Sequence, residues 1–114
     1  MTKQTSHAVL PSAPVDLVAV AIGDSQVLLA WTECEGGALA FRIERAEGIG
    51  SACLFSEIGR TGVHVAVFRD GAVHPRKSYS YRVHAWNDSG VSSPSNVVEV
   101  MTSPVETESP AGKD

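Results

Sequence analysis

Residues 79–87 read YSYRVHAWN, which is the most regular alternation in the chain. One parity holds Tyr79, Tyr81, Val83 and Ala85, and the other holds Ser80, Arg82, His84 and Trp86. Because successive side chains of a strand point to opposite faces, this pattern predicts a strand with one buried face. The turn residues 87–90, Asn-Asp-Ser-Gly, end it.

Six further apolar runs surround this strand, each bounded by turn residues, as an all-β fold requires. They are Val15–Ile22, Gln26–Thr32, Leu39–Arg45, Leu54–Arg60, Val63–Asp70 and Val97–Thr102. Both parities of the first run are apolar, which indicates a bulge or an edge position. The more polar fourth run is predicted to be an edge strand, and the apolar residues of the fifth leave its register open. Seven strands are therefore expected.

The second and third runs supply the predicted core. Val27, Leu29 and Trp31 share one side of the second run, and Phe41 and Ile43 share one side of the third. Trp31 is therefore interpreted as a core residue and not as a platform for stacking a ligand.

Length, composition and charge limit the classes of function. A chain of 114 residues with 43% hydrophobic and 19% charged residues fits one globular domain. The formal charge of −4 offers no basic stripe for nucleic acid. No apolar run is long enough for membrane insertion. We expect a flexible segment over residues 1–10, a sandwich over 11–103 and a Pro/Ser/Glu-rich tail or linker over 104–114. A monomer is expected.

The chain resembles a fibronectin type III domain from about Pro11 to Thr102. The matching features are Pro14 before the first strand, Trp31 closing the second, Phe41 and Ile43 in the third, Val73 six residues before Tyr79, and residues 79–87 followed by Gly90, Ser92 and Ser95. The resemblance implies a two-sheet antiparallel β-sandwich of seven strands with immunoglobulin-like, fibronectin type III topology. In that topology strands A, B and E pack against strands C′, C, F and G.

The resemblance also carries expectations about function. It implies a non-catalytic module that serves as a protein-binding platform or a spacer within a larger or surface-associated protein, at an extracellular or cell-surface location. Residues 68–73 look like those of bacterial members found beside secreted hydrolases. The loop at 87–90 lacks the Arg-Gly-Asp of integrin-binding members, and Arg69-Asp70-Gly71 is interpreted as a turn. By analogy with other sandwiches, Tyr79 is expected to form a tyrosine corner, with its hydroxyl bonded to upstream backbone.

The sequence shows no catalytic, cofactor-binding or metal site. No Gly-x-Ser-x-Gly motif occurs, the four histidines lack the close spacing of a zinc site, and no helix pattern follows Gly48-Ile49-Gly50. Glu33 and Glu35 are expected in a solvated loop. Asn87-Asp88-Ser89 formally matches an N-glycosylation acceptor. Cys34 and Cys53 are predicted to be free thiols, because opposite ends of the sandwich lie roughly 20 Å apart and a disulfide spans about 7 Å.

One candidate partner-binding face emerges from the outward parity of the third and sixth runs. Its residues are Arg42, Glu44, Arg82, His84 and Trp86. Neighbouring strands would allow an arginine to lie over the indole and Glu44 to pair with a second arginine. Two interpretations stay open: arginine stems cover Trp86 on an ordinary solvated sheet, or the face binds a protein partner.

Two alternative functions stay open as well. A carbohydrate-binding accessory module of a secreted hydrolase would need several exposed coplanar aromatics, and only Trp86 is a candidate. A small cytoplasmic regulatory protein is favoured by the absence of a signal peptide, because Met1–Ala13 contains no apolar h-region.

Overall fold

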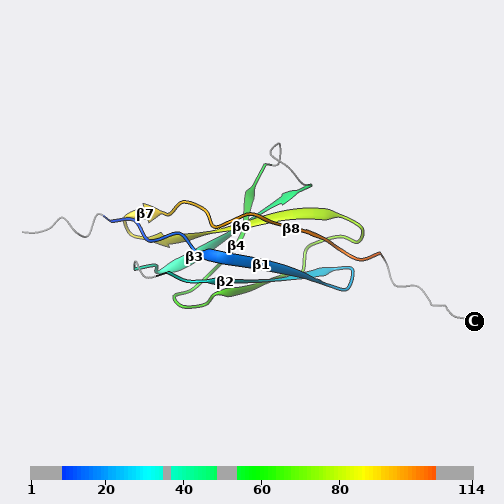
Figure 1. Ribbon diagram of the computed structural model, residues 1–114, viewed down its shortest axis with the longest axis horizontal. Helices are drawn as coiled ribbons and strands as arrows, with labels where there is room; N and C mark the ends of the chain where they lie inside the picture. The colour runs from blue at the N-terminus through cyan, green and yellow to red at the C-terminus, as the bar shows by residue number, and fades with distance from the viewer. Residues whose placement is uncertain (1–8, 35–36, 49–53, 105–114) are drawn as a thin grey trace, which may run out of the picture.

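The computed structural model describes residues 9–34, 37–48 and 54–104, which form a sandwich of two antiparallel sheets (Figure 1). Its strands are β1 (Val15–Ile22), β2 (Gln26–Thr32), β3 (Ala40–Glu47), β4 (Ser56–Thr61), β5 (Val67–Asp70), β6 (Ser78–Asn87), β7 (Gly90–Val91) and β8 (Val98–Met101). No helix that could cross a membrane occurs within these ranges.

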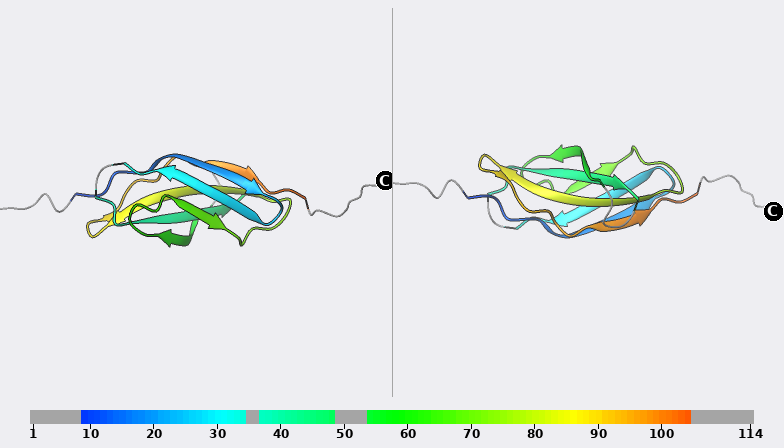
Figure 2. Two further views of the ribbon diagram at one scale, coloured as in Figure 1. Left: turned by 90° about the horizontal axis from the view of Figure 1, so that it is seen from below. Right: turned by 90° about the horizontal axis from the view of Figure 1, so that it is seen from above.

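The two sheets have the composition that the resemblance implied. One has the order β1-β2-β5, and the other has the order β4-β3-β6-β7, with β8 also pairing with β6. Figure 2 shows the two layers stacked face to face, with β1 and β2 in one layer and β3 and β6 in the other. Strands A, B and E therefore pack against C′, C, F and G, as predicted.

The core lies between the sheets and follows the predicted inward parities. Its buried members are Leu17, Val27, Leu29, Trp31, Ala38, Phe41, Ile43, Val73, Tyr79, Tyr81, Val83 and Ala85. Trp31 and Phe41 meet edge to face across the sheets, with ring centroids 5.6 Å apart. Such contacts add to the burial of the two rings themselves. The interpretation of Trp31 as a core residue is confirmed.

The structure confirms two predictions about edge strands and shortens the fifth predicted strand. β4 is an edge strand, and β1 is both an edge strand and bulged, with a register shift between Val15 and Val18. The fifth predicted run is a strand only from Val67 onward. His64 has a φ of 64°, and the N–H of Val65 bonds to the carbonyl of Gly62, so a turn occupies the start of the run.

The last predicted run, Val97–Thr102, forms β8, and the short strand β7 before it was not predicted, which raises the strand count from seven to eight. Between them Pro94 has no N–H to donate to a ladder. The hydroxyls of Ser92 and Ser95 instead accept hydrogen bonds from the N–H groups of Ala85 and Val83 at 2.9 and 3.0 Å. Side chains thus replace the missing part of the ladder.

The tyrosine corner is present. The N–H of His74 donates to the buried hydroxyl of Tyr79 at 2.9 Å. A second side chain bonds to the backbone of β1. Asn96 Oδ1 accepts from the N–H of Leu17 at 2.9 Å, and Asn96 Nδ2 donates to the carbonyl of Leu17 at 3.0 Å. Both contacts pair backbone groups that the ladders leave open.

The described chain enters at one end of the long axis and leaves at the opposite end (Figure 1). The predicted end segments 1–10 and 104–114 lie almost entirely outside the described residues, as do Glu35, Ile49, Gly50 and Cys53. Cys34 is a free, half-buried thiol. The prediction for Cys53 stays a prediction.

Candidate partner-binding face

The outward side chains of β4, β3 and β6 line up in cross-strand rows. Arg60 lies opposite Arg42, which lies opposite His84. In the next row Glu57 lies opposite Glu44, which lies opposite Arg82. Trp86 follows His84 on β6 by the strand period of two. The structure therefore brings all five predicted residues onto one face, and it adds Glu57 and Arg60 from the edge strand.

Glu44 is the centre of this face. Its Oε1 accepts hydrogen bonds from Arg82 Nε at 2.6 Å and from His84 Nε2 at 3.1 Å, and its side chain is only 12% exposed. Burial raises the pKa of the Glu44 carboxyl, but the hydrogen bonds and charges of Arg82 and His84 outweigh it, so the pKa lies below its ordinary value. The predicted pairing of Glu44 with an arginine is confirmed.

His84 is buried between two acceptors. Its Nδ1 lies 2.9 Å from the carbonyl oxygen of Ser92, and its Nε2 faces Glu44. Because a carbonyl and a carboxylate both need a donor, the two hydrogen bonds form together only when both ring nitrogens carry protons. The imidazole thus links β3, β6 and the segment between β7 and β8.

Arg82 stacks on an aromatic ring, but not on the predicted one. Its guanidinium carbon lies 4.2 Å from the centroid of Phe55, just before β4. The expectation of an arginine over the Trp86 indole is wrong, because the cation–π contacts among the described residues are those of Arg82 with Phe55 and of Arg45 with Tyr79. The side chain of Trp86 is half-buried and makes no hydrogen bond or ring contact within the described ranges, although its backbone carbonyl accepts a hydrogen bond from the N–H of Leu39 at 2.7 Å.

Arg42 lies between the two carboxylates without a hydrogen bond to either. Its Nε is 3.8 Å from Glu44 Oε2 and 3.8 Å from Glu57 Oε1. Both distances exceed hydrogen-bond range. The Nε atom is also buried and has no partner among the described residues. Arg60 by contrast binds Glu57 through Nε at 2.6 Å.

A separate polar group, missed in the sequence, connects the two sheets inside the molecule. Asp70, at the end of β5, is only 4% exposed and binds Arg45 Nη1 through both oxygens, at 3.1 and 2.9 Å. It also accepts a hydrogen bond from the hydroxyl of Tyr81 at 2.7 Å. Burial and the bond to Asp70 raise the pKa of Tyr81. Asp70 Oδ1 also accepts a hydrogen bond from the N–H of Ala72 at 3.0 Å, so the chain turns directly after β5, while Arg69 and Asp70 themselves end the strand.

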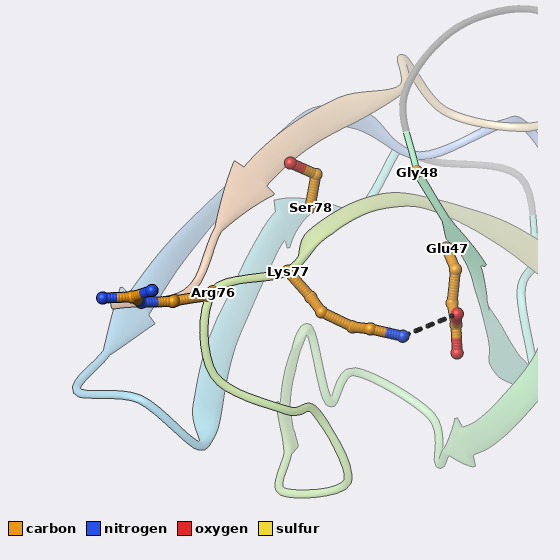
Figure 3. Close-up of a pocket in the computed structure, with 5 residues that line it drawn as sticks. All are labelled: Glu47, Gly48, Arg76, Lys77 and Ser78. Carbon is orange, nitrogen blue, oxygen red and sulfur yellow. Dashed lines mark hydrogen bonds and ion pairs between the residues drawn. The ribbon is translucent and has the colours of Figure 1, made fainter. Parts of the chain in front are cut away.

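An open hollow of about 380 Å³ lies beside the start of β6 and is lined by Glu47, Gly48, Arg76, Lys77 and Ser78 (Figure 3). Lys77 Nζ pairs with Glu47 Oε1 at 3.2 Å, and Arg76 points away from that pair. The polar groups do not converge on one point, so the hollow lacks the features of a ligand site. No group of three potential metal ligands occurs among the described residues.

No protein-family model matches the sequence, and no curated protein is significantly similar to it. Solved structures do match. A crystal structure of titin domains superimposes with a TM-score of 0.73 at 20% identity, covering 82% of this chain and 32% of that one. The solution structure of the fibronectin type III domain of human fibronectin type III domain containing protein 3 gives a TM-score of 0.68 at 24% identity and covers 90% and 92% of the two chains.

Some similar structures are much longer than this chain. The twitchin kinase region from C. elegans matches with a TM-score of 0.70 at 23% identity, covering 82% of this chain and 17% of that one. Domains of this kind therefore occur as modules of larger proteins. The likeness establishes the fold: the chain is a fibronectin type III-like domain.

Proposed function

We propose that this fibronectin type III-like domain is a non-catalytic module of a larger or surface-associated protein, and that it binds a protein partner through the outer face of β3 and β6. The residues of this binding face are Arg42, Glu44, Arg82, His84 and Trp86, with Glu57 and Arg60 at its edge.

The observation that supports this proposal is the position of Trp86. Its half-buried ring has no polar or aromatic contact of its own, and it lies beside side chains that Glu44 holds in place. Trp and Arg are the residue types enriched among binding hot spots. A fixed arrangement also loses less conformational entropy on binding than a set of mobile side chains.

A spacer role is compatible with the same module. The described chain enters and leaves at opposite ends of the long axis (Figure 1). Domains joined to the two ends would be held apart by the length of the sandwich, while the binding face on its side would stay accessible.

The test is a pull-down with the full-length protein, followed by affinity measurements with Trp86→Ala. We expect binding to weaken by more than about 2 kcal/mol, roughly 30-fold, with a nearly unchanged unfolding midpoint. The matched control is Val20→Thr, an exposed residue on the outer face of the other sheet, which should bind normally. Loss of stability with intact binding would show that Trp86 only packs, and the face would be dropped as a binding site.

A further inference from the structure

We infer that the partner segment recognised by this face is an acidic peptide, with a carboxylate that binds Arg42. This inference rests on the proposed function and names the chemistry of the partner at the same face.

The first observation is the balance of charge. Within the two cross-strand rows, the arginines at 42, 60 and 82, together with the imidazolium of His84 when it is protonated, face only Glu44 and Glu57. Glu99, a further carboxylate on this side, lies opposite Ser80 on β8 and has no ion pair among the described residues. The three arginines exceed the two glutamates by one charge, which Glu99 offsets, so the excess of positive charge is confined to the row of Arg60, Arg42 and His84, which contains no carboxylate.

The second observation is which arginine lacks hydrogen bonds. Arg60 is bound to Glu57, and Arg82 is bound to Glu44 and stacked on Phe55. The side chain of Arg42 is 27% exposed and makes no hydrogen bond within the described ranges, and its buried Nε lies 3.8 Å from Glu44 and from Glu57. A guanidinium presents five donors in a fork that matches a carboxylate, so an incoming carboxylate would bind the terminal Nη donors of Arg42 and not its buried Nε.

The third observation is the arrangement around Arg42. Cross-strand neighbours on one face lie about 5 Å apart, and diagonal neighbours about 7–8 Å apart. Arg60 and His84 are the direct neighbours of Arg42, and Trp86 is a diagonal one because it lies opposite Ala40. A peptide could therefore place an acidic side chain on Arg42 and an apolar side chain on Trp86. A basic peptide would meet like charge in the same row.

The experiment uses the whole chain and two probes, hexaglutamate and a peptide of the same length that alternates glutamine and serine. Amide and indole NMR shifts are followed during titration at low and at high salt. We expect hexaglutamate to shift the signals of residues 42, 60, 84 and 86, the uncharged peptide to shift none, and salt to weaken the effect.

The variants separate this site from general attraction between charges. Arg42→Gln should weaken hexaglutamate binding about tenfold, because it removes the open donors and one charge. Arg69→Gln removes one charge from the opposite face and should leave binding nearly unchanged. Arg42→Lys keeps the charge and should bind more tightly than Arg42→Gln, and the thermal midpoint of each variant checks that a loss of binding is not caused by unfolding.

Two results would overturn the inference: equal shifts from both peptides, or equal weakening in Arg42→Gln and Arg69→Gln. If these occur while Trp86→Ala still weakens binding of the natural partner, the face binds a partner of different chemistry. If Trp86→Ala also has no effect, the proposed function itself is wrong.

Discussion

The two outer faces of the sandwich differ sharply, although both belong to sheets of the same small domain. The outer face of β1-β2-β5 presents Val18, Val20, Leu28 and Val67, all more than a third exposed. Apart from the exposed Asp16 at the bulge of β1, the charged residue on the outside of this sheet is Arg69, which bonds to Gln26 at 3.3 Å. The outer face of β4-β3-β6 instead presents two rows of charged side chains joined through Glu44.

This difference shows that the side chains facing the core decide the fold, whereas the fold does not determine the residue types on the two outer faces. Both sheets bury the same kinds of apolar side chains between them, whereas their outer sides share almost nothing. Side chains that leave water only partly contribute little to stability, because the hydrophobic effect scales with the apolar area removed from water. The following predictions test this separation, from the largest expected effect to the smallest.

Substitutions of the side chains that β2 buries in the core should lower the unfolding free energy most. Trp31→Ala is expected to cost about 3–5 kcal/mol of unfolding free energy, because a large cavity in a small core relaxes only partly. The indole N–H has no partner among the described residues, so no hydrogen bond is lost with it. Phe41→Ala should cost a similar amount, since its ring packs against Trp31. Urea denaturation measures both, and an unchanged midpoint for Trp31→Ala would contradict its place in the core.

The ion pair between the sheets should matter more than the one on the charged face. Asp70→Ala is expected to cost about 3 kcal/mol, because it leaves Arg45 and Tyr81 without their shared acceptor in a largely buried place. Glu57→Ala, which removes an exposed ion pair, should cost much less. Equal shifts of the thermal midpoint in the two variants would show that burial of the ion pair does not increase its contribution to stability.

Glu44 should make an intermediate contribution to the free energy of unfolding, and this contribution should depend on pH. Glu44→Gln is expected to lower stability by about 1–2 kcal/mol at neutral pH, because charged hydrogen bonds from Arg82 and His84 are lost. The pKa of this carboxyl is depressed in the folded state, so its contribution is present above the ordinary value of 4.5 and is lost as the pH falls through the folded-state pKa. Urea unfolding at pH 7 and pH 3 measures the difference.

The two proteins should therefore converge in stability at acidic pH. A difference between wild type and Glu44→Gln that stays the same at both pH values would mean that charge at Glu44 does not stabilise the fold. Arg69→Gln serves as a control, because it changes one charge on the other face.

Substitutions on the exposed apolar face of β1-β2-β5 should change the stability least. Val20→Thr is expected to change stability by no more than about 0.5 kcal/mol, because the side chain is 57% exposed. Calorimetric unfolding of the isolated chain measures it. A loss of 2 kcal/mol or more would show that this face is covered in solution, and the contrast between the two faces would no longer hold.

Several features of the fold could be predicted from local pattern alone. The alternation in residues 79–87, the inward side of Gln26–Thr32 and the edge character of Leu54–Arg60 each follow from a period of two or from polarity. The bounds of β1 and β2 match the predicted runs. The fifth run was harder, because valines at 63, 65 and 67 suggest a strand where the backbone makes a turn. β-branched side chains indicate a pleated surface but do not prevent a turn from forming there.

The candidate face was predictable in its members but not in its contacts. Period two places Arg42, Glu44, Arg82, His84 and Trp86 on the outer side of two strands, and the fibronectin type III resemblance makes those strands neighbours. The edge strand joins them at a register shift between Ile43 and Glu44, which sets Glu57 opposite Glu44 and Arg60 opposite Arg42. A bulge of this kind leaves no clear mark in the sequence.

The sequence by itself determined which side chains face inward, because burial of an apolar face selects one register and a slip by one residue would expose it. Only the tertiary structure decided which charged groups meet. Ion pairs such as Arg82 with Glu44 and Arg45 with Asp70 join residues 38 and 25 positions apart. Their distances depend on register and on the packing of one sheet against the other, and Coulomb energy depends on those distances. For the same reason, the lack of a hydrogen bond at Arg42 is a property of the folded chain and not of its pattern of residues.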